Sequence, residues 1–250
     1  MPENILNPDE KIGVLIKTSL VDYPGHMACA VFLYGCNLRC PYCYNTGLVL
    51  GDSKETDGAV SLSVIKDHLK KRRNVLSGIV ISGGEPALSP FFYELLRVAK
   101  ELNYLVKIDT NGTIPERIET ILNDKFLSPD FVALDIKTVL SSYPVLAPYI
   151  TDESIKKRMI ASVKKSIELV SALPADKREF RTVLVPGLVD KNNVKEIAEL
   201  LPEDASWKFA PFRNENCLDE RYNSIIPYTQ SEMEEIVAEA QKIIPLAQLR

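Results

Sequence analysis

The stretch Cys36-Asn37-Leu38-Arg39-Cys40-Pro41-Tyr42-Cys43 carries three cysteines in eight residues, at the spacing C-x3-C-x2-C. Three thiolates at this spacing can bind three irons of a four-iron cluster and leave the fourth iron open to a small molecule. A cluster with four cysteine ligands has no such open position. The run therefore indicates a catalyst rather than a plain electron carrier.

Two other interpretations of the cysteines stay open from spacing alone. Zinc also binds C-x2-C pairs, but a structural zinc site needs a fourth Cys or His, and the five Cys and two His of the chain form no second pair. Buried cysteines can also act as small hydrophobes, which suits Cys29 in its apolar run better than the others. Cys29 and Cys217 cannot hold a second cluster, so we expect one cluster only and expect Cys217 to be a free surface thiol.

The composition is ordinary for a globular protein that folds without disulfides. The chain has 250 residues, 46% of them hydrophobic and 26% charged, with a formal net charge of −4. We expect one domain over 1–250, with an N-terminal extension over 1–27. No apolar stretch is long enough to span a membrane, and the polar start gives no secretory signal. Clustered thiols suit a reducing compartment, so we expect a cytoplasmic protein, with no membrane or nucleic-acid partner.

Short apolar runs alternate with amphipathic stretches along most of the chain. Period-two runs predict strands, and apolar residues three and four apart predict helices. The predicted strands cover 29–34, 78–82, 104–109, 131–137, 179–185 and 206–210. The predicted helices cover 61–73, 90–102, 115–123, 153–172, 191–200 and 230–243. Ser89 before Pro90, and Thr151, are the expected caps of two of these helices.

Six strand–helix units in a row predict a parallel sheet with helices outside it. The sheet could be a partial barrel or a doubly wound open sheet, and in both the ligands bind at the carboxyl ends of the strands. The stretches that follow the predicted strands are polar or rich in glycine or proline, at 36–43, 82–86, 109–112, 135–137, 185–187 and 211–213. Their convergence at one edge of the sheet is stronger evidence for a binding site than any one motif.

Two of these stretches place charges in mainly apolar surroundings. Gly83-Gly84 would let the backbone approach a ligand, with Glu85 as a carboxylate for an ammonium group, although a plain strand-to-helix turn explains the glycines equally well. Asp135 and Lys137 are two apart on a predicted strand and therefore share a face. Because buried charges are costly unless paired or used, these two residues predict either ligand contact or mutual neutralisation.

The other stretches give weaker signals. The run Asp109-Thr110-Asn111-Gly112 could bind ribose hydroxyls or a cation, but it could equally be a turn. Arg181, on the fifth predicted strand, could meet a carboxylate, and a position in solvent explains it as well. Arg213, after the sixth strand, gives a similar but weaker signal.

Taken together, these motifs resemble the radical S-adenosylmethionine superfamily over about residues 11–212. The cysteine run matches its C-x3-C-x-aromatic-C signature, and Gly83-Gly84-Glu85-Pro86 matches its Gly-Gly-Glu motif. The resemblance implies the fold class α/β, as a partial (β/α)6 TIM-like barrel. It also implies one [4Fe-4S] cluster on Cys36, Cys40 and Cys43, with S-adenosylmethionine on the open iron. That cofactor supplies the 5'-deoxyadenosyl radical, so no side chain is expected to act as a catalytic base.

A narrower resemblance is to the activases of glycyl-radical enzymes, carried by 19–25, 109–112, 134–137 and 185–187. The whole pattern is most similar to the type that activates anaerobic ribonucleoside-triphosphate reductase. It implies that S-adenosylmethionine is bound by Tyr42, Tyr44, Gly83, Gly84, Glu85, Asp109, Asn111, Lys137, Arg181 and Arg213. It further implies a monovalent cation at Asp109, Thr110 and Asp135. One departure is Arg213, where pyruvate formate-lyase activases have a histidine.

The resemblance implies a glycyl-radical enzyme as protein substrate and a flavodoxin or ferredoxin as electron donor. Two aromatic loops, 143–149 and 222–228, would suit a protein interface, and packing inside the fold is an equal alternative. Two rival functions stay open. One is a radical enzyme acting on a small molecule, similar to a deazapurine synthase, in a closed pocket over Arg181 and Arg213. The other is a metal-binding module without catalysis.

Overall fold

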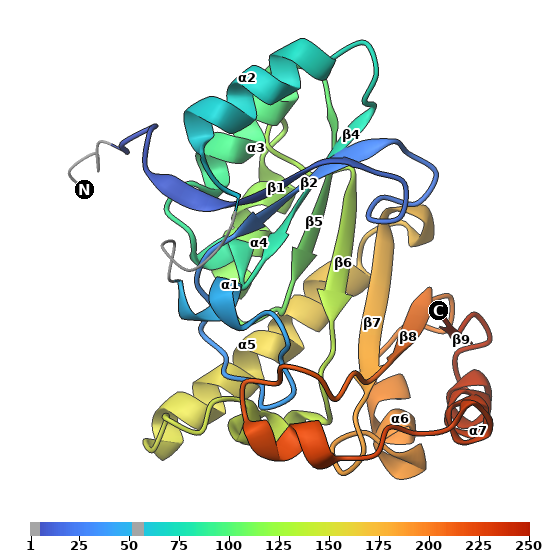
Figure 1. The fold of residues 1–250 in the computed structure, drawn as a ribbon. Helices are drawn as coiled ribbons and strands as arrows, with labels where there is room; N and C mark the ends of the chain where they lie inside the picture. The colour runs from blue at the N-terminus through green and yellow to red at the C-terminus, as the bar shows by residue number, and fades with distance from the viewer. Residues whose placement is uncertain (1–5, 52–57) are drawn as a thin grey trace. The chain divides into compact units, whose positions relative to one another are not determined.

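The computed structural model describes residues 6–51 and 58–250 (Figure 1). Residues 1–5 of the expected N-terminal extension lie outside the described residues. The chain divides into two compact units, each described by itself. Unit 1 contains Met1–Cys36, Gly47–Asp109 and Thr120–Asp130, and unit 2 contains Asn37–Thr46, Thr110–Glu119 and Phe131–Arg250.

The sheet of unit 1 has the strand order β3-β1-β2-β4-β5. Its strands are β1 (Lys11–Ser19), β2 (Ala28–Leu33), β3 (Ala59–Ser61), β4 (Gly78–Gly83) and β5 (Leu105–Thr110). β2, β4 and β5 are parallel, whereas β1 runs antiparallel to both of its neighbours. Parallel strands need crossover connections, and helices supply them here. The helices of unit 1 are α1 (Thr46–Leu50, all but its first residue), α2 (Leu62–Arg72) and α3 (Phe92–Glu101). The next helix, α4 (Pro115–Asn123), begins in unit 2 and ends in unit 1.

The sheet of unit 2 has the strand order β6-β7-β8-β9, and its neighbouring strands are parallel. The strands are β6 (Phe131–Asp135), β7 (Arg178–Leu184), β8 (Trp207–Pro211) and β9 (Gln248–Leu249). The helices are α5 (Glu153–Ser171), α6 (Lys191–Ala198) and α7 (Gln230–Gln241). Short 3-10 helices cover Pro86–Leu88, Leu140–Leu146, Ala175–Lys177 and Glu220–Ser224 in the two units. No helix of the described residues is both long and apolar enough to cross a membrane.

Apolar spacing explains why these segments pack as they do. On α3, Phe92, Leu95, Leu96 and Ala99 recur at helical spacing, and all four are fully buried. In unit 2 the fully buried Trp207 donates from its indole Nε1 to Thr182 Oγ1 at 2.9 Å, so its polar atom is paired within the core.

The six strands and six helices expected from the sequence are all present, with ends shifted by up to two residues. Two expected helix caps are wrong. α3 begins at Phe92, and Ser89 Oγ instead accepts a hydrogen bond from Phe91 N at 3.2 Å, one turn before the helix. α5 is capped by Asp152, not Thr151, because the Asp152 carboxylate accepts from Ser154 N at 2.7 Å.

Strand β1 was missed by the sequence analysis, which treated 1–27 as an extension. Its centre, Gly13 to Ile16, pairs with β2, and it also carries β3 at the edge of the sheet. The β-branched Ile12, Val14 and Ile16 were a readable signal. Without a following helix, however, the segment did not fit the strand–helix alternation used to find the others.

A buried ion pair on β5 was also missed. Lys107 Nζ bonds to Asp109 Oδ1, with side-chain exposures of 2% and 13%. The two residues are two apart on a strand and share a face, which is the argument that had been applied to Asp135 and Lys137. A fully buried ammonium group requires such a partner.

We predict that Lys107→Met destabilises the chain by about 3 kcal/mol, because Asp109 would lose its buried cationic partner. The measurement is the free energy of unfolding by chemical denaturation. Lys195→Met is the matched control, since Lys195 pairs with Glu239 at 3.3 Å but is 51% exposed. Exposed pairs contribute at most about 1 kcal/mol, so equal losses in the two variants would contradict a stabilising role for the buried pair.

Candidate functional site

The cluster loop, residues 36–43, begins at Cys36, the last residue of the first segment of unit 1, and its other residues belong to unit 2. In unit 2 its second residue, Asn37, is held by side chains that follow β5. Asn37 Nδ2 donates to Thr113 Oγ1 at 2.8 Å, and Asn111 Nδ2 donates to Asn37 Oδ1 at 3.3 Å. Thr113 Oγ1 in turn donates to Asn111 Oδ1 at 2.6 Å. The buried Asn111 therefore supports the cluster loop directly.

The 3-10 segment Leu140–Leu146 and the residues after it hold the next part of the loop. Arg39 N donates to Leu146 O at 2.7 Å, and Tyr149 Oη donates to Asn37 O. The Arg39 guanidinium carbon also lies 5.9 Å from the centroid of the Tyr149 ring. The 143–149 loop is thus part of the site: Tyr143 is fully buried, while Tyr149 is half exposed with its hydroxyl engaged.

The last part of the cluster loop is held by residues that follow β8. Leu218 N donates to Cys43 O at 2.9 Å, and Asp219 N donates to Pro41 O at 3.0 Å. Within the loop, Cys43 N donates to Cys40 O at 3.0 Å and closes a turn. Main-chain bonds to neighbours therefore fix this loop, which has no regular secondary structure of its own.

In unit 1, Gly83 at the end of β4 and Gly84 directly after it fit tightly against the segment that leads into Cys36. Gly84 N donates to Leu33 O at 3.0 Å, and Glu85 N donates to Gly35 O at 2.8 Å. A Cβ on Gly84 would lie 2.2 Å from Gly35 O and 3.0 Å from Cys36 Cβ. A Cβ on Gly83, whose φ is +134°, would lie 2.2 Å from Leu33 O. The close approach that glycine permits here is therefore to the chain's own backbone.

Glu85 is fully buried directly after these glycines. One of its oxygens, Oε1, accepts a hydrogen bond from Ala87 N at 3.0 Å and so caps the short helix Pro86–Leu88. A buried carboxylate is costly unless it is well paired, so its retention at this position requires a structural or binding role.

In unit 2, Asp135 lies between two cations. Its Oδ1 accepts from Arg181 Nε at 2.7 Å, and its Oδ2 accepts from Lys137 Nζ at 3.4 Å. Burial alone would raise the pKa of Asp135, but Arg181 and Lys137 together outweigh it and hold the pKa below its ordinary value. Of the two readings of Asp135 and Lys137, mutual neutralisation is therefore present, and it includes Arg181. Asp135, Lys137 and Arg181 thus form one cluster of three charged side chains.

Tyr42 lies beside this cluster with its side chain 7% exposed. Its hydroxyl has no hydrogen-bond partner among the described residues. Burial is the main reason that the pKa of Tyr42 is raised well above its usual value, and the nearby Cys40 thiol adds to it. Because an unpaired buried hydroxyl costs free energy, Tyr42 Oη is a candidate contact for a bound ligand.

The expectation that Cys217 is a surface thiol is wrong. Its side chain is only 6% exposed, and burial, followed by the neighbouring Cys43 and Asp219, raises the pKa of its thiol. In the same part of unit 2, the Arg213 guanidinium carbon lies 5.9 Å from the centroid of the Tyr44 ring. The two predicted ligand residues Arg213 and Tyr44 are thus brought together.

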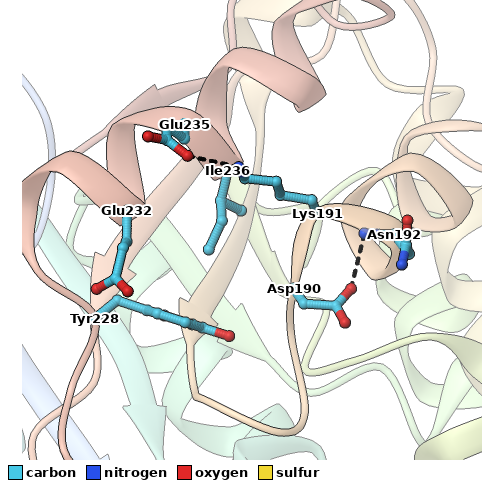
Figure 2. A pocket seen from close by; sticks show the side chains of 7 residues that line it. All are labelled: Asp190, Lys191, Asn192, Tyr228, Glu232, Glu235 and Ile236. Atoms are coloured by element: carbon cyan, nitrogen blue, oxygen red, sulfur yellow. Dashed lines mark hydrogen bonds and ion pairs between the residues drawn. The ribbon is translucent and has the colours of Figure 1, made fainter.

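One open cavity elsewhere in unit 2 does not qualify as a ligand site. Its volume is about 400 Å³, and Figure 2 shows its lining: Asp190, Lys191, Asn192, Tyr228, Glu232, Glu235 and Ile236. The polar groups there are already used. Asp190 caps α6, Glu232 belongs to the capping box of α7, and Lys191 Nζ pairs with Glu235 at 2.5 Å. None of the residues predicted to bind a ligand lines this cavity.

The predicted site residues divide into two groups, one in each unit. Unit 1 holds Cys36, Gly83, Gly84, Glu85 and Asp109, and unit 2 holds Cys40, Tyr42, Tyr44, Thr110, Asn111, Asp135, Lys137, Arg181 and Arg213. Asp109 is paired with Lys107, and Thr110 Oγ1 accepts from Gly112 N at 3.2 Å, which forms a local turn. Sequence reasoning missed Asn37 and Thr113, although short polar side chains in a cysteine-rich loop are a recognisable signal.

The donor set suits an iron–sulfur cluster. All five cysteines are free thiols. Among residues 6–51 and 58–250, no three His, Cys, Asp or Glu side chains lie close enough together to hold a single metal ion. Cluster ligands bind different irons and need not converge on one point. The Tyr42 hydroxyl, without a partner among the described residues, and a cysteine loop held by main-chain hydrogen bonds are both consistent with a bound cofactor.

Comparison with known proteins identifies the family. The model of the radical SAM superfamily matches residues 30–201. A protein of Methanocaldococcus jannaschii, provisionally named a glycyl-radical enzyme activating enzyme, is 31% identical over 93% of this chain and 92% of its own length. The pyruvate formate-lyase-activating enzyme of Clostridium pasteurianum is 31% identical over 76% of each chain. This chain belongs to the radical SAM superfamily and is an enzyme of that type.

Solved structures support the fold. The structure of TYW1 with a lysine-pyruvate adduct bound matches 86% of this chain and 73% of its own, with a TM-score of 0.57 and 14% identity. The structure of Streptococcus suis SuiB bound to S-adenosylmethionine matches 86% of this chain and 47% of its own, with a TM-score of 0.55 and 15% identity. The α/β fold class of the radical SAM type, expected from the sequence, is confirmed.

We predict that Gly84→Ala costs about 2 kcal/mol of stability, because the new Cβ overlaps Gly35 O and forces the backbone beside Cys36 to shift. Unfolding free energy and bound iron after anaerobic reconstitution measure the effect, and both should fall. Gly25→Ala is the control for iron retention: its φ of +76° makes alanine there strained too, but a Cβ meets nothing within 4 Å, so bound iron should stay at the wild-type level. Full iron retention in Gly84→Ala would contradict the role assigned to this close packing.

The lowered pKa of Asp135 predicts a contribution to acid stability. A carboxylate whose folded-state pKa is depressed stabilises the fold above its unfolded pKa of about 3.9, and this contribution is lost as the pH falls through the folded pKa. Unfolding free energies at pH 6 and pH 3 should therefore differ less in Asp135→Asn than in the wild type. An equal difference in both proteins would show that the pairing with Arg181 and Lys137 does not stabilise the folded state.

Proposed function

We propose that this enzyme is an activase that generates a glycyl radical on a partner enzyme. The observation that carries the proposal is the 31% identity, over 93% of the chain, to a relative provisionally named as such an activating enzyme. Pyruvate formate-lyase-activating enzymes of Clostridium pasteurianum and Escherichia coli, at 31% and 28% identity, support the same class. The motifs at 19–25, 109–112, 134–137 and 185–187 favour anaerobic ribonucleoside-triphosphate reductase as the particular partner.

In this proposal Cys36, Cys40 and Cys43 hold one [4Fe-4S] cluster, on the strength of their spacing and the family. When bound and reduced, the cluster and S-adenosylmethionine supply a 5'-deoxyadenosyl radical, so the protein's part is binding and orientation. Flavodoxin or ferredoxin is the proposed electron donor. A cytoplasmic location is proposed because five free thiols suit a reducing compartment.

The chain's own residues would place the second cofactor by charge and shape. Lys137 and Arg181 both pair with Asp135. Lys137 could turn its ammonium group toward a carboxylate of the cofactor at modest cost, because Asp135 would still be paired with Arg181 at 2.7 Å. Glu85 is a fully buried carboxylate and would accept a hydrogen bond from an ammonium group of the cofactor. Tyr42 Oη offers an unpaired donor, and Tyr44 with Arg213 offers a flat cationic–aromatic surface for a base.

The remaining proposed contacts are Gly83, Gly84, Asp109 and Asn111, together with a monovalent cation at Asp109, Thr110 and Asp135. The cation site is the least supported element. Asp109 is already paired with Lys107, and Asp135 is paired with Arg181 and Lys137, so a cation would have to compete with residues of the chain itself.

Reconstitution without oxygen tests the proposal. The reduced wild-type protein should convert S-adenosylmethionine to 5'-deoxyadenosine and methionine, and Cys36→Ala, Cys40→Ala and Cys43→Ala should abolish this cleavage. Cys29→Ala is the matched control, because Cys29 is fully buried in β2 and its pKa is raised to about 12 by burial. It should retain cleavage.

The partner is tested separately by electron paramagnetic resonance. Anaerobic ribonucleoside-triphosphate reductase incubated with the loaded enzyme should acquire an organic glycyl-radical signal. Cleavage without any radical on this reductase would contradict the particular partner and leave the reaction class intact. Bound zinc without iron after anaerobic preparation would contradict the enzyme reaction itself and favour the metal-binding module.

A further inference from the structure

The segment that follows β8, residues 212–223, forms a closed loop, here named the clamp loop. The rings of Phe212 and Tyr222 meet edge to face at its base, with centroids 6.4 Å apart and planes at 90°. Asn214 Nδ2 donates to Asn223 O across the same base at 3.4 Å. The two ends of the loop are therefore joined independently of the cluster loop.

The interior of the clamp loop is organised by one amide side chain. Asn223 Oδ1 accepts a hydrogen bond from Cys217 N at 2.9 Å. The Cys217 thiol is buried beneath the loop, with its Sγ 3.6 Å from Arg213 O. Asn216, just before it, has a φ of 53°, a left-handed conformation that asparagine adopts more easily than most residues. The turn at 216–217 thus depends on the acceptor that Asn223 supplies.

The tip of the clamp loop makes the contacts with the cluster loop. The two peptide N–H groups after Cys217 belong to Leu218 and Asp219, and they donate to Cys43 O and Pro41 O. These carbonyls flank Tyr42. Orientation of the Cys217 peptide by Asn223 therefore sets the direction of the next two donors along the chain.

We propose that the clamp loop positions the 41–43 half of the cluster loop and that Asn223 is the positioning residue. Asn223 lies in the aromatic loop 222–228, but it is not among the residues predicted to bind the cofactors, and it acts on the cluster loop through the Cys217 peptide. In this proposal Cys217 is a buried structural residue of the clamp loop and not a cluster ligand. The effect on cluster retention rests on the proposed function. The clamp loop itself can be tested on the protein without cofactors.

The first experiment uses the cofactor-free full chain, so it does not depend on the proposed function. Alkylation by iodoacetamide is followed peptide by peptide in Asn223→Ala. Cys217 and Cys43 should react about tenfold faster than in the wild type, because the loop opens locally. Cys29, buried in unit 1, is the internal reference and should not change. Asn223→Asp keeps an acceptor oxygen and should restore rates close to the wild type.

A matched control separates the clamp from general loosening. Asn123→Ala removes an exposed amide at the end of α4, in unit 1, and should leave every alkylation rate unchanged. Rates within about twofold of the wild type in a folded Asn223→Ala would overturn the proposal, as would an equal increase in Asn123→Ala. If Asn223→Ala does not fold, Leu218→Pro removes the N–H that Cys43 O accepts and must give the same increase at Cys43.

The second experiment measures cluster retention directly. Wild type, Asn223→Ala and Asn223→Asp are loaded anaerobically, and the loss of iron to a ferrous chelator is followed by absorbance. Iron should leave Asn223→Ala several-fold faster, with Asn223→Asp close to the wild type. Equal rates in all three would overturn the link to the cluster. Failure of every protein, wild type included, to load iron would instead contradict the proposed function and leave the alkylation result standing.

Discussion

The site depends on one constraint: the cluster loop must satisfy its backbone polar groups while its thiols stay free. Buried N–H and C=O groups need hydrogen-bond partners, and a loop without helix or strand must find these partners in other segments of the chain. Asn37 O, Arg39 N, Pro41 O and Cys43 O each find one, from Tyr149, Leu146, Asp219 and Leu218 respectively. Those partners come from two separate segments of unit 2, so the loop is fixed by distant parts of the chain.

A second feature is that two groups of paired charges, each buried or partly buried, lie within single units. Lys107 is paired with Asp109 in unit 1, and Asp135 is paired with Arg181 and Lys137 in unit 2. The two arrangements differ in their consequences. The first is closed, with both groups nearly buried. In the second, part of each of the three side chains stays exposed, and a partly exposed group of charged side chains is a candidate place for a charged group of a ligand.

Much of the fold could be predicted because local pattern and tertiary packing agree for most elements. α4 was predicted with the ends that the structure shows, Pro115 and Asn123, because proline begins it and its apolar spacing is regular. Prediction and structure differ where contacts with a neighbouring segment determine the local structure. Thr151 and Asp152 are both good caps, and only the direction of the chain into α5 selects Asp152. β1 has no helix directly after it, and its place in the sheet comes from pairing with β2 and β3.

The sequence by itself determined the chemistry: three free thiols at a defined spacing, the Gly-Gly-Glu motif, and the order of strands and helices. These are readable because they depend on residue type and on spacing along the chain. Only the tertiary structure decided how those residues are held. The burial of Cys217, the clamp on Pro41 and Cys43, and the fit of Gly84 against Gly35 join residues that are tens to well over a hundred positions apart. Such contacts are set by the packing of strands and loops in space, to which no local pattern in the sequence corresponds.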